Sequence, residues 1–264
     1  MTSDYKRYAI YWVPRVGTDL AAFGRGWTGW CAEQASNGKD EAAQALIKGH
    51  PGTLWQTCLH GLHAPICHPF RMKPRGAQWR LDKILQRVAA SVRPIPLPRF
   101  QVTVRRGQVV LALERPCEQL EALQGLVTDA ARLVSRRRRP RPAGVRKFAT
   151  AGIALPSDEV HPAPLVTPFH MPLTGEIEAS AAYDLAADLY PQLSQILALP
   201  QRVSDIALMG DPGGGRPWRL VERYRLVGTG TYASGPMPDG MICPDTRPMP
   251  PLAALLGSGW QTVI

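Results

Sequence analysis

Proline and glycine set the strongest constraint on how this chain folds. There are 26 prolines and 24 glycines among 264 residues. Both residue types shorten regular elements, since proline breaks helices and ladders and glycine weakens them. The sequence therefore favours short strands and helices joined by many turns over a helical bundle. With 45% hydrophobic and 20% charged residues, it can still build an ordinary core as one large domain or two small ones.

The spacing of apolar residues predicts an alternation of strands and helices. Strands are expected at 6–13, 100–105, 108–114, 169–173, 202–209 and 218–227. Helices are expected at 19–33, 81–92, 117–134 and 179–197, while 35–52 has the polar composition of a loop. Helices packed against antiparallel strands define an α+β fold.

A short internal echo is the main functional signal. Residues 62–67 read LHAPIC and residues 169–174 read FHMPLT, each followed by a predicted helix and hairpin. A duplicated unit would bring His63 and His170 to equivalent positions on a pseudo-twofold cleft. Two facing imidazoles suit acid–base chemistry, because one accepts a proton while the other donates one. The alternative is two histidines packed in separate strands.

Four segments carry a family resemblance. Residues 60–72 (HGLHAPICHPFRM) and 168–175 (PFHMPLTG) resemble the two motifs of the two-histidine (2H) phosphoesterases. Residues 7–14, and 205–210 with 216–224, resemble the opening strand and closing hairpin of its branch labelled "phosphonate metabolism protein". The resemblance implies two pseudo-symmetric lobes of antiparallel sheet with helices packed outside. That bilobal domain would span 1–227, with strands exchanged between lobes, a linker near 135–168 and a Pro/Gly-rich tail at 228–264.

The resemblance implies that His63 and His170 are catalytic and that neither a cofactor nor a metal is needed. The family pattern is His-x-Thr/Ser, whose hydroxyls bind phosphate, but here Pro65 and Pro172 occupy those positions. Proline offers neither a side-chain hydrogen bond nor a backbone N–H. Other residues are expected to bind the substrate in place of these hydroxyls. Thr174 and Cys67 lie four residues beyond the histidines, Arg71, Arg7 and Arg219 could supply charge, and Tyr11 completes the predicted substrate-binding set.

The net charge of +10, from 31 Lys and Arg against 21 Asp and Glu, favours anionic partners. A small anionic substrate is the leading expectation. RNA is an alternative partner through the charge run Arg136–Arg141, whose other interpretation is a solvated linker. No run of 18 apolar residues occurs, so no membrane span is expected. Five scattered cysteines without an export signal predict reduced thiols in a cytoplasm.

Metal binding is the alternative to acid–base chemistry for the segment around His63. Cys58, His60, His63, Cys67 and His68 lie within eleven residues, but strand alternation would divide them between two faces, and no zinc-type spacing occurs. His60 and His68 are then expected at the surface or in loops. Three functions remain open: a metal-independent enzyme acting on a small phosphate ester, cyclic phosphate or phosphonate; a non-hydrolytic relative that binds a ligand or partner; and the same cleft used on a non-phosphate substrate.

Overall fold

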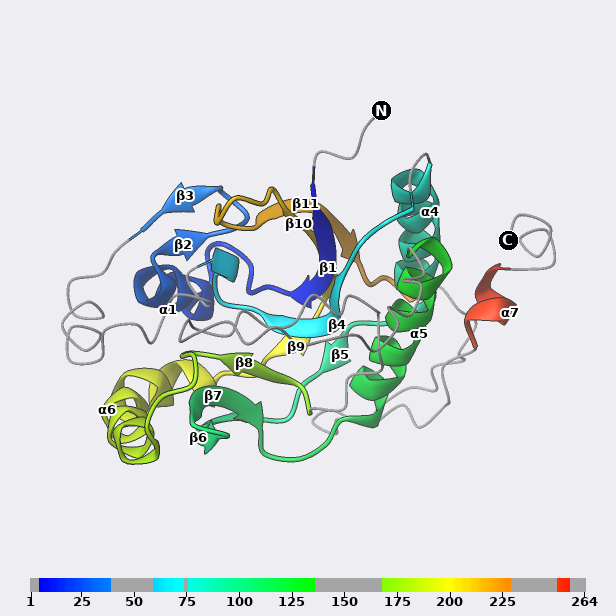
Figure 1. Cartoon of the computed structure of the whole chain (residues 1–264). Coiled ribbons are helices and arrows are strands. Elements are labelled where there is room, and N and C mark those ends of the chain that lie inside the picture. The colour runs from blue at the N-terminus through cyan, green and yellow to red at the C-terminus, as the bar shows by residue number, and fades with distance from the viewer. Residues whose placement is uncertain (1–4, 39–58, 74–75, 136–167, 229–250, 257–264) are drawn as a thin grey trace, which may run out of the picture.

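The computed structural model describes residues 5–38, 59–73, 76–135, 168–228 and 251–256. Its two larger sheets are antiparallel, with helices packed against them (Figure 1). The expected α+β class is confirmed. The predicted pseudo-symmetry of two lobes stays a prediction, since the two sheets hold four and three strands.

The first sheet has the order β11-β10-β1-β4. β1 (Arg7–Trp12) lies between β10 (Asp205–Asp211) and β4 (Ala64–Phe70), and β11 (Arg219–Arg225) forms the outer edge. All three pairings are antiparallel, so the C-terminal hairpin is built onto the N-terminal strand.

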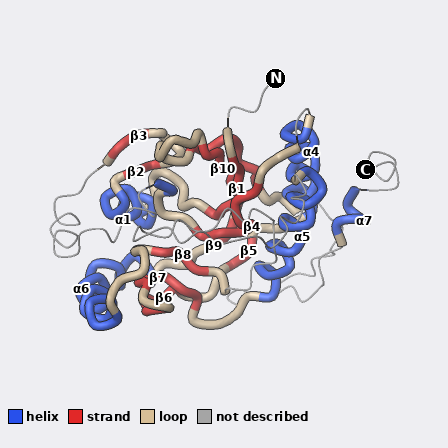
Figure 2. The backbone as a smooth tube through the Cα atoms, viewed as in Figure 1, coloured by secondary structure: helices blue, strands red, loops and turns tan. Residues whose placement is uncertain are grey.

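The second sheet has the order β6-β7-β8. A hairpin of β6 (Phe100–Arg105) and β7 (Gln108–Leu113) turns at Arg106 and Gly107, both with positive φ, as its Arg-Gly turn predicted. The third strand is β8 (His170–Pro172), which pairs with β7. A short ladder of β5 (Ile95–Pro96) and β9 (Arg202–Val203) lies between the sheets (Figure 2). The sheets meet where β4 packs against β8.

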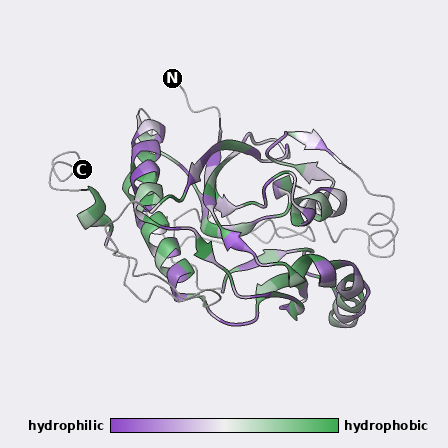
Figure 3. Cartoon of the chain, turned by 180° about the vertical axis from the view of Figure 1, so that it is seen from behind, coloured by the Kyte–Doolittle hydropathy of each residue, from purple (hydrophilic) through white to green (hydrophobic). Residues whose placement is uncertain are grey.

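Two long helices cover the first sheet. α4 (Ala77–Ser91) packs against β11, and α5 (Glu118–Val134) packs against β4 and α4. Apolar residues recur along each helix at helical spacing, which gives hydrophilic and hydrophobic bands on each (Figure 3). Burial of these bands, at about 25 cal/mol per Å² of apolar area, is the main stabilising contribution to this layer.

Helix α1 (Asp19–Thr28) holds both histidine-bearing segments. Thr18 caps it by accepting from the N–H of Ala21. Gly24 approaches Leu62 so closely that a Cβ there would lie 2.5 Å from the Leu62 side chain. On the same helix, the Trp27 indole N–H donates to the carbonyl of Leu173 at 2.8 Å. α1 therefore fixes the chain just before His63 and just after β8.

One core runs through both sheets. It contains Ile10 from β1, Leu111 from β7, Val127 from α5 and Leu189 from α6 (Ala179–Ala198), a helix that continues through Pro191. Alternation on β1 separates this core from a smaller cluster on the opposite face, which contains the following residues: Ala9, Tyr11, Val13, Trp30, Ala32, Ala207, Met209 and Trp218. The smaller cluster supports the candidate site.

Some predicted boundaries were wrong. The first helix ends at Thr28 rather than residue 33, because Gly29 adopts a left-handed cap with φ of 71°. The chain then forms a hairpin of β2 (Trp30–Cys31) and β3 (Ser36–Asn37), where a loop was expected from residue 35. Within the predicted tail, α7 (Leu252–Leu256) packs against α4 and α5. The Arg136–Arg141 run and most of the predicted linker lie outside the described residues.

Candidate active site

The two echo histidines have the same local geometry. His63 directly precedes β4, and its Nδ1 lies 2.8 Å from the carbonyl oxygen of Gly61. His170 begins β8, and its Nδ1 lies 2.7 Å from the carbonyl oxygen of Pro168. A carbonyl only accepts, so each Nδ1 carries the proton and donates to the carbonyl two residues earlier. In each ring Nε2 is then the nitrogen that does not face the carbonyl.

The environments of the two rings differ. His63 is 6% exposed, whereas His170 is half-buried. Burial is the main cause that lowers the pKa of His63 to about 4; the charge of His170 lowers it further, and the bond to Gly61 opposes the shift. At neutral pH His63 is therefore an uncharged imidazole that can accept a proton.

A stack of rings surrounds His63 on the smaller cluster's side. The His60 ring lies 5.0 Å from that of His63 and 4.7 Å from that of Trp218, at interplanar angles of 22° and 25°. The Tyr11 ring centroid is 4.3 Å from that of His63, and its hydroxyl is 3.2 Å from Nδ1 of His60. Burial raises the pKa of Tyr11, so the phenol keeps its proton.

The frame around Trp218 is made of backbone hydrogen bonds. Its N–H donates to the carbonyl of Leu59 at 2.7 Å, and its own carbonyl accepts from the indole of Trp30 at 2.9 Å. Trp218 is 2% exposed. It is consequently a fixed wall of the stack, held by Trp30 of β2 and by Leu59, which directly precedes His60.

Of the predicted cationic residues, Arg7 lies beside this stack. Its Nε donates to a carboxylate oxygen of Asp211 at 2.7 Å, and its guanidinium carbon lies 5.7 Å from the Trp218 ring. Its charge lowers the pKa of both Tyr11 and His60. With a side chain 34% exposed, Arg7 retains N–H groups that can meet an anion.

The structure does not bring Cys67 beside His63. Strand alternation predicted a shared face, but β4 is bulged: Tyr11 pairs with Pro65 and Ile10 pairs with Cys67, so one step on β1 matches two on β4. The bulge turns Cys67 into the main core, where it is fully buried. Burial raises the pKa of its thiol to about 12, which leaves it a packing residue.

Thr174 is also a structural residue. It is 1% exposed, its hydroxyl accepts from the N–H of Val109 at 2.9 Å, and it donates to the carbonyl of Gly175 at 2.8 Å. Both hydrogen-bonding directions of the hydroxyl are thus used by backbone groups. The predicted role of Thr174 as a phosphate-binding hydroxyl stays a prediction, and these backbone bonds do not favour it.

Two predicted arginines lie elsewhere. Arg71 follows the far end of β4, eight residues from His63, which at the rise of a strand is about 25 Å. Arg219 pairs with Gly210, which pairs with Tyr8. Directly paired residues share a face, so Arg219 lies on the side of the sheet opposite Tyr11.

His60 and Trp218 were missed as site residues. Sequence reasoning expected His60 at the surface because it assumed a continuous strand through residues 58–68. Instead, Gly61 has φ of +70°, a conformation suited to glycine, and turns the chain before β4 begins. The glycine in His-Gly-Leu-His was the available signal that residues 60 and 63 do not alternate.

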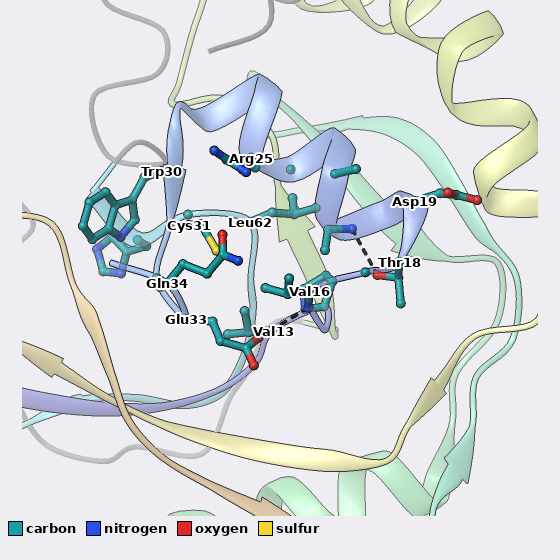
Figure 4. Close-up of a pocket in the computed structure, with 18 residues that line it drawn as sticks. Val13, Val16, Thr18, Asp19, Arg25, Trp30, Cys31, Glu33, Gln34 and Leu62 are labelled. Carbon is teal, nitrogen blue, oxygen red and sulfur yellow. Dashed lines mark hydrogen bonds between the residues drawn. The ribbon is translucent and has the colours of Figure 1, made fainter. Parts of the chain in front are cut away.

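A cavity of about 250 Å³ adjoins the stack between α1, β2 and residues 60–62 (Figure 4). His60 contributes to its lining, as do Cys31 and Gln34. The Glu33 carboxylate in this region accepts from the N–H of Val16 at 3.4 Å and from Arg223 at 2.7 Å. The cavity is thus a neighbour of the stack and not a part of the His63–His170 pair.

Metal ligation and membrane insertion find no support in the described residues. Within those ranges, no three His, Cys, Asp or Glu side chains gather as a metal site requires. His68, one of the predicted alternative ligands, is exposed on β4. Among the described helices, none combines the length and hydrophobicity that crossing a bilayer requires.

Comparison with known proteins gives a partial family match. The model of a family described as "Protein of unknown function (DUF1045)" matches residues 66–153, about a third of the chain, and includes neither His63 nor His170. No curated protein matches. Two solved structures of Usb1 from Kluyveromyces marxianus, one with uridine monophosphate, are 11% and 10% identical. Each covers 84% of this chain and 99% of its own, with a TM-score of 0.39. At that score neither carries a conclusion about fold or activity.

Proposed function

We propose that this protein is a metal-independent acid–base enzyme that uses His63 and His170 on a small phosphate ester, cyclic phosphate or phosphonate ester. The observation that carries the proposal is the matched tautomer of the two rings. Each Nδ1–H donates to a carbonyl two residues earlier, at 2.8 and 2.7 Å. An Nε2 nitrogen is therefore the reactive atom of both rings, and the charge of His170 adds to the burial that lowers the pKa of His63.

The different burial of the rings supports distinct roles. His63 enters the reaction neutral, so its Nε2 takes the proton from the attacking water or hydroxyl. His170 contacts solvent, from which its Nε2 can be protonated, and it gives that proton to the leaving oxygen. The two rings exchange roles in the reverse direction. We assign the substrate's negative charge to Arg7, which Asp211 holds beside Trp218.

The test is turnover by the full chain of 2′,3′-cyclic nucleotides, bis(p-nitrophenyl) phosphate and p-nitrophenyl phenylphosphonate, measured with a chelator present. We expect His63→Ala and His170→Ala each to lower kcat by about 10²- to 10⁴-fold, the usual contribution of a general acid or base. Trp79→Ala is the control, because it removes an exposed aromatic side chain on α4. Equal turnover by the wild type and the His63→Ala variant would rule out the mechanism.

A second function is favoured by the two prolines. Pro65 and Pro172 stand where a phosphate-binding hydroxyl is expected, and the hydroxyl of Thr174 is already bonded on both sides. A site with prolines at these positions also suits a neutral substrate or a bound ligand that is not hydrolysed. Inorganic phosphate discriminates between the proposals: competition at the site favours the phosphoesterase, whereas turnover or binding of a neutral compound that phosphate does not affect favours the second function.

A further inference from the structure

Three rings lie in sequence behind the proposed base. Trp218, His60 and His63 stack with centroids 4.7 and 5.0 Å apart and with planes within 25° of parallel. The outer ring, Trp218, is held by backbone hydrogen bonds on both sides. His60 is therefore placed between a fixed wall and His63.

The orientation of His60 is fixed independently by Tyr11. Burial raises the pKa of the phenol, which keeps its proton, and its hydroxyl is hydrogen-bonded to Nδ1 of His60 across 3.2 Å, with the direction of the bond set by the tautomer of His60. Tyr11 also contacts His63 directly at 4.3 Å between ring centroids. Two rings thus define the plane of His63, and each has a fixed position of its own.

We propose that His60 is a positioning residue, which fixes the ring plane of His63 and excludes water from one face of it. The inference rests on the proposed role of His63 as the base. His60 itself stays neutral, because burial and the charges of His63 and Arg7 lower its pKa well below 6.5. It can therefore cover His63 without placing a positive charge beside it.

The His60 ring, by covering one face of His63, helps to explain why His63 is neutral. Burial is the largest cause of the low pKa of His63, at about 4, and His60 provides one side of that burial. Removing the covering ring should admit water and move the pKa toward its ordinary value of 6.5. Other titratable or charged groups that surround the stack keep their places in such a variant: Tyr11 and Arg7 on β1, Asp211 on β10 and His170 on β8.

Two variants separate covering from hydrogen bonding. His60→Ala removes the ring. The double variant His60→Phe with Tyr11→Phe keeps both rings and removes the hydrogen bond with both of its partners, which leaves no unpaired hydroxyl. His68→Ala is the matched histidine deletion outside the stack. Far-UV circular dichroism and thermal unfolding establish that each variant is folded at the temperature of the assay.

The decisive measurement is the titration of His63 followed by ¹⁵N NMR of histidine-labelled protein. We expect His60→Ala to raise the pKa of His63 by at least about one unit, while the double variant and His68→Ala leave it near the wild-type value. An unchanged pKa in His60→Ala overturns the proposal, as does a shift of equal size in the double variant.

A kinetic measurement separates this inference from the proposed function. In a turnover assay, the acid limb of the pH–kcat/KM profile should move to higher pH in His60→Ala and stay in place in the double variant. If the wild type turns over none of the phosphate or phosphonate esters, the proposed function fails, but the NMR titration still decides whether His60 positions His63. If turnover depends on His63 but the pKa of His63 is unchanged in His60→Ala, only the positioning role of His60 is overturned.

Discussion

The burial of His63 predicts a specific loss of stability in acid. In the unfolded chain a histidine has a pKa near 6.5, whereas in the folded protein the pKa of His63 is about 4. The unfolded state therefore binds a proton first as the pH falls. The stability from the neutral, buried ring is complete above pH 6.5, declines below it, and is lost as the pH passes through about 4.

The size of the effect follows from the two pKa values. At pH 5 the unfolded histidine is mostly protonated and the folded one mostly neutral, so the free energy of unfolding is lower than at pH 7 by about 2 kcal/mol from this residue alone. The full difference of about 2.5 units corresponds to about 3 kcal/mol. Because His63 is only 6% exposed, solvent screening does not appreciably reduce this contribution to stability.

His63→Phe isolates this contribution, because a phenyl ring can occupy the stack and does not titrate. Urea unfolding at pH 5, 6 and 7 should show the wild type losing about 2 kcal/mol more than the variant between pH 7 and pH 5. His60 also makes the protein less stable in acid, because burial and the charge of His63 lower its pKa. His68→Phe, on the exposed side of β4, should change the slope less. Parallel pH dependences of the wild type and His63→Phe would refute the buried, neutral assignment.

Three further predictions concern the other predicted site residues. Thr174→Val should lower the free energy of unfolding by about 1–3 kcal/mol in urea titrations, because the Val109 N–H loses its acceptor, while kcat per folded molecule stays unchanged; a loss of kcat would return this hydroxyl to the site. Asp211→Asn releases the ionic partner of Arg7 and should change KM for a phosphate ester several-fold with little effect on kcat, so an unaltered KM argues against that cation as the anion contact. Cys67, fully buried with a raised thiol pKa, should resist a thiol-labelling reagent in the native protein and react only on unfolding; rapid native labelling at that residue would place it in an open cleft instead.

Local sequence signals determined much of the fold. Apolar residues at helical spacing in α4 and α5 and the Arg-Gly turn between β6 and β7 carry their information within a few neighbouring residues. The order of these elements was enough for the α+β class, because helices and strands must bury their apolar faces against each other. The echo around His63 and His170 was likewise visible in the sequence.

Side-chain directions near the histidines could not be predicted from alternation. A bulge in β4 turns Cys67 into the core, and Gly61 turns His60 back onto His63. Each is a one-residue irregularity that reverses the face of the residues beyond it. Sequence patterns give the mean period of a strand but not the place where that period is interrupted.

The sequence by itself determined which residues could do chemistry: two histidines in matching contexts, a basic excess and prolines in place of hydroxyls. Only the tertiary structure decided which of them share one environment. Arg7, Tyr11, His60, His63 and Trp218 come from three segments far apart in the chain. Pairing of β1 with β4 and β10, together with the hydrogen bond from the N–H of Trp218 to the carbonyl of Leu59, brings those segments together. The protonation state of His63 follows from that burial, which no local pattern encodes.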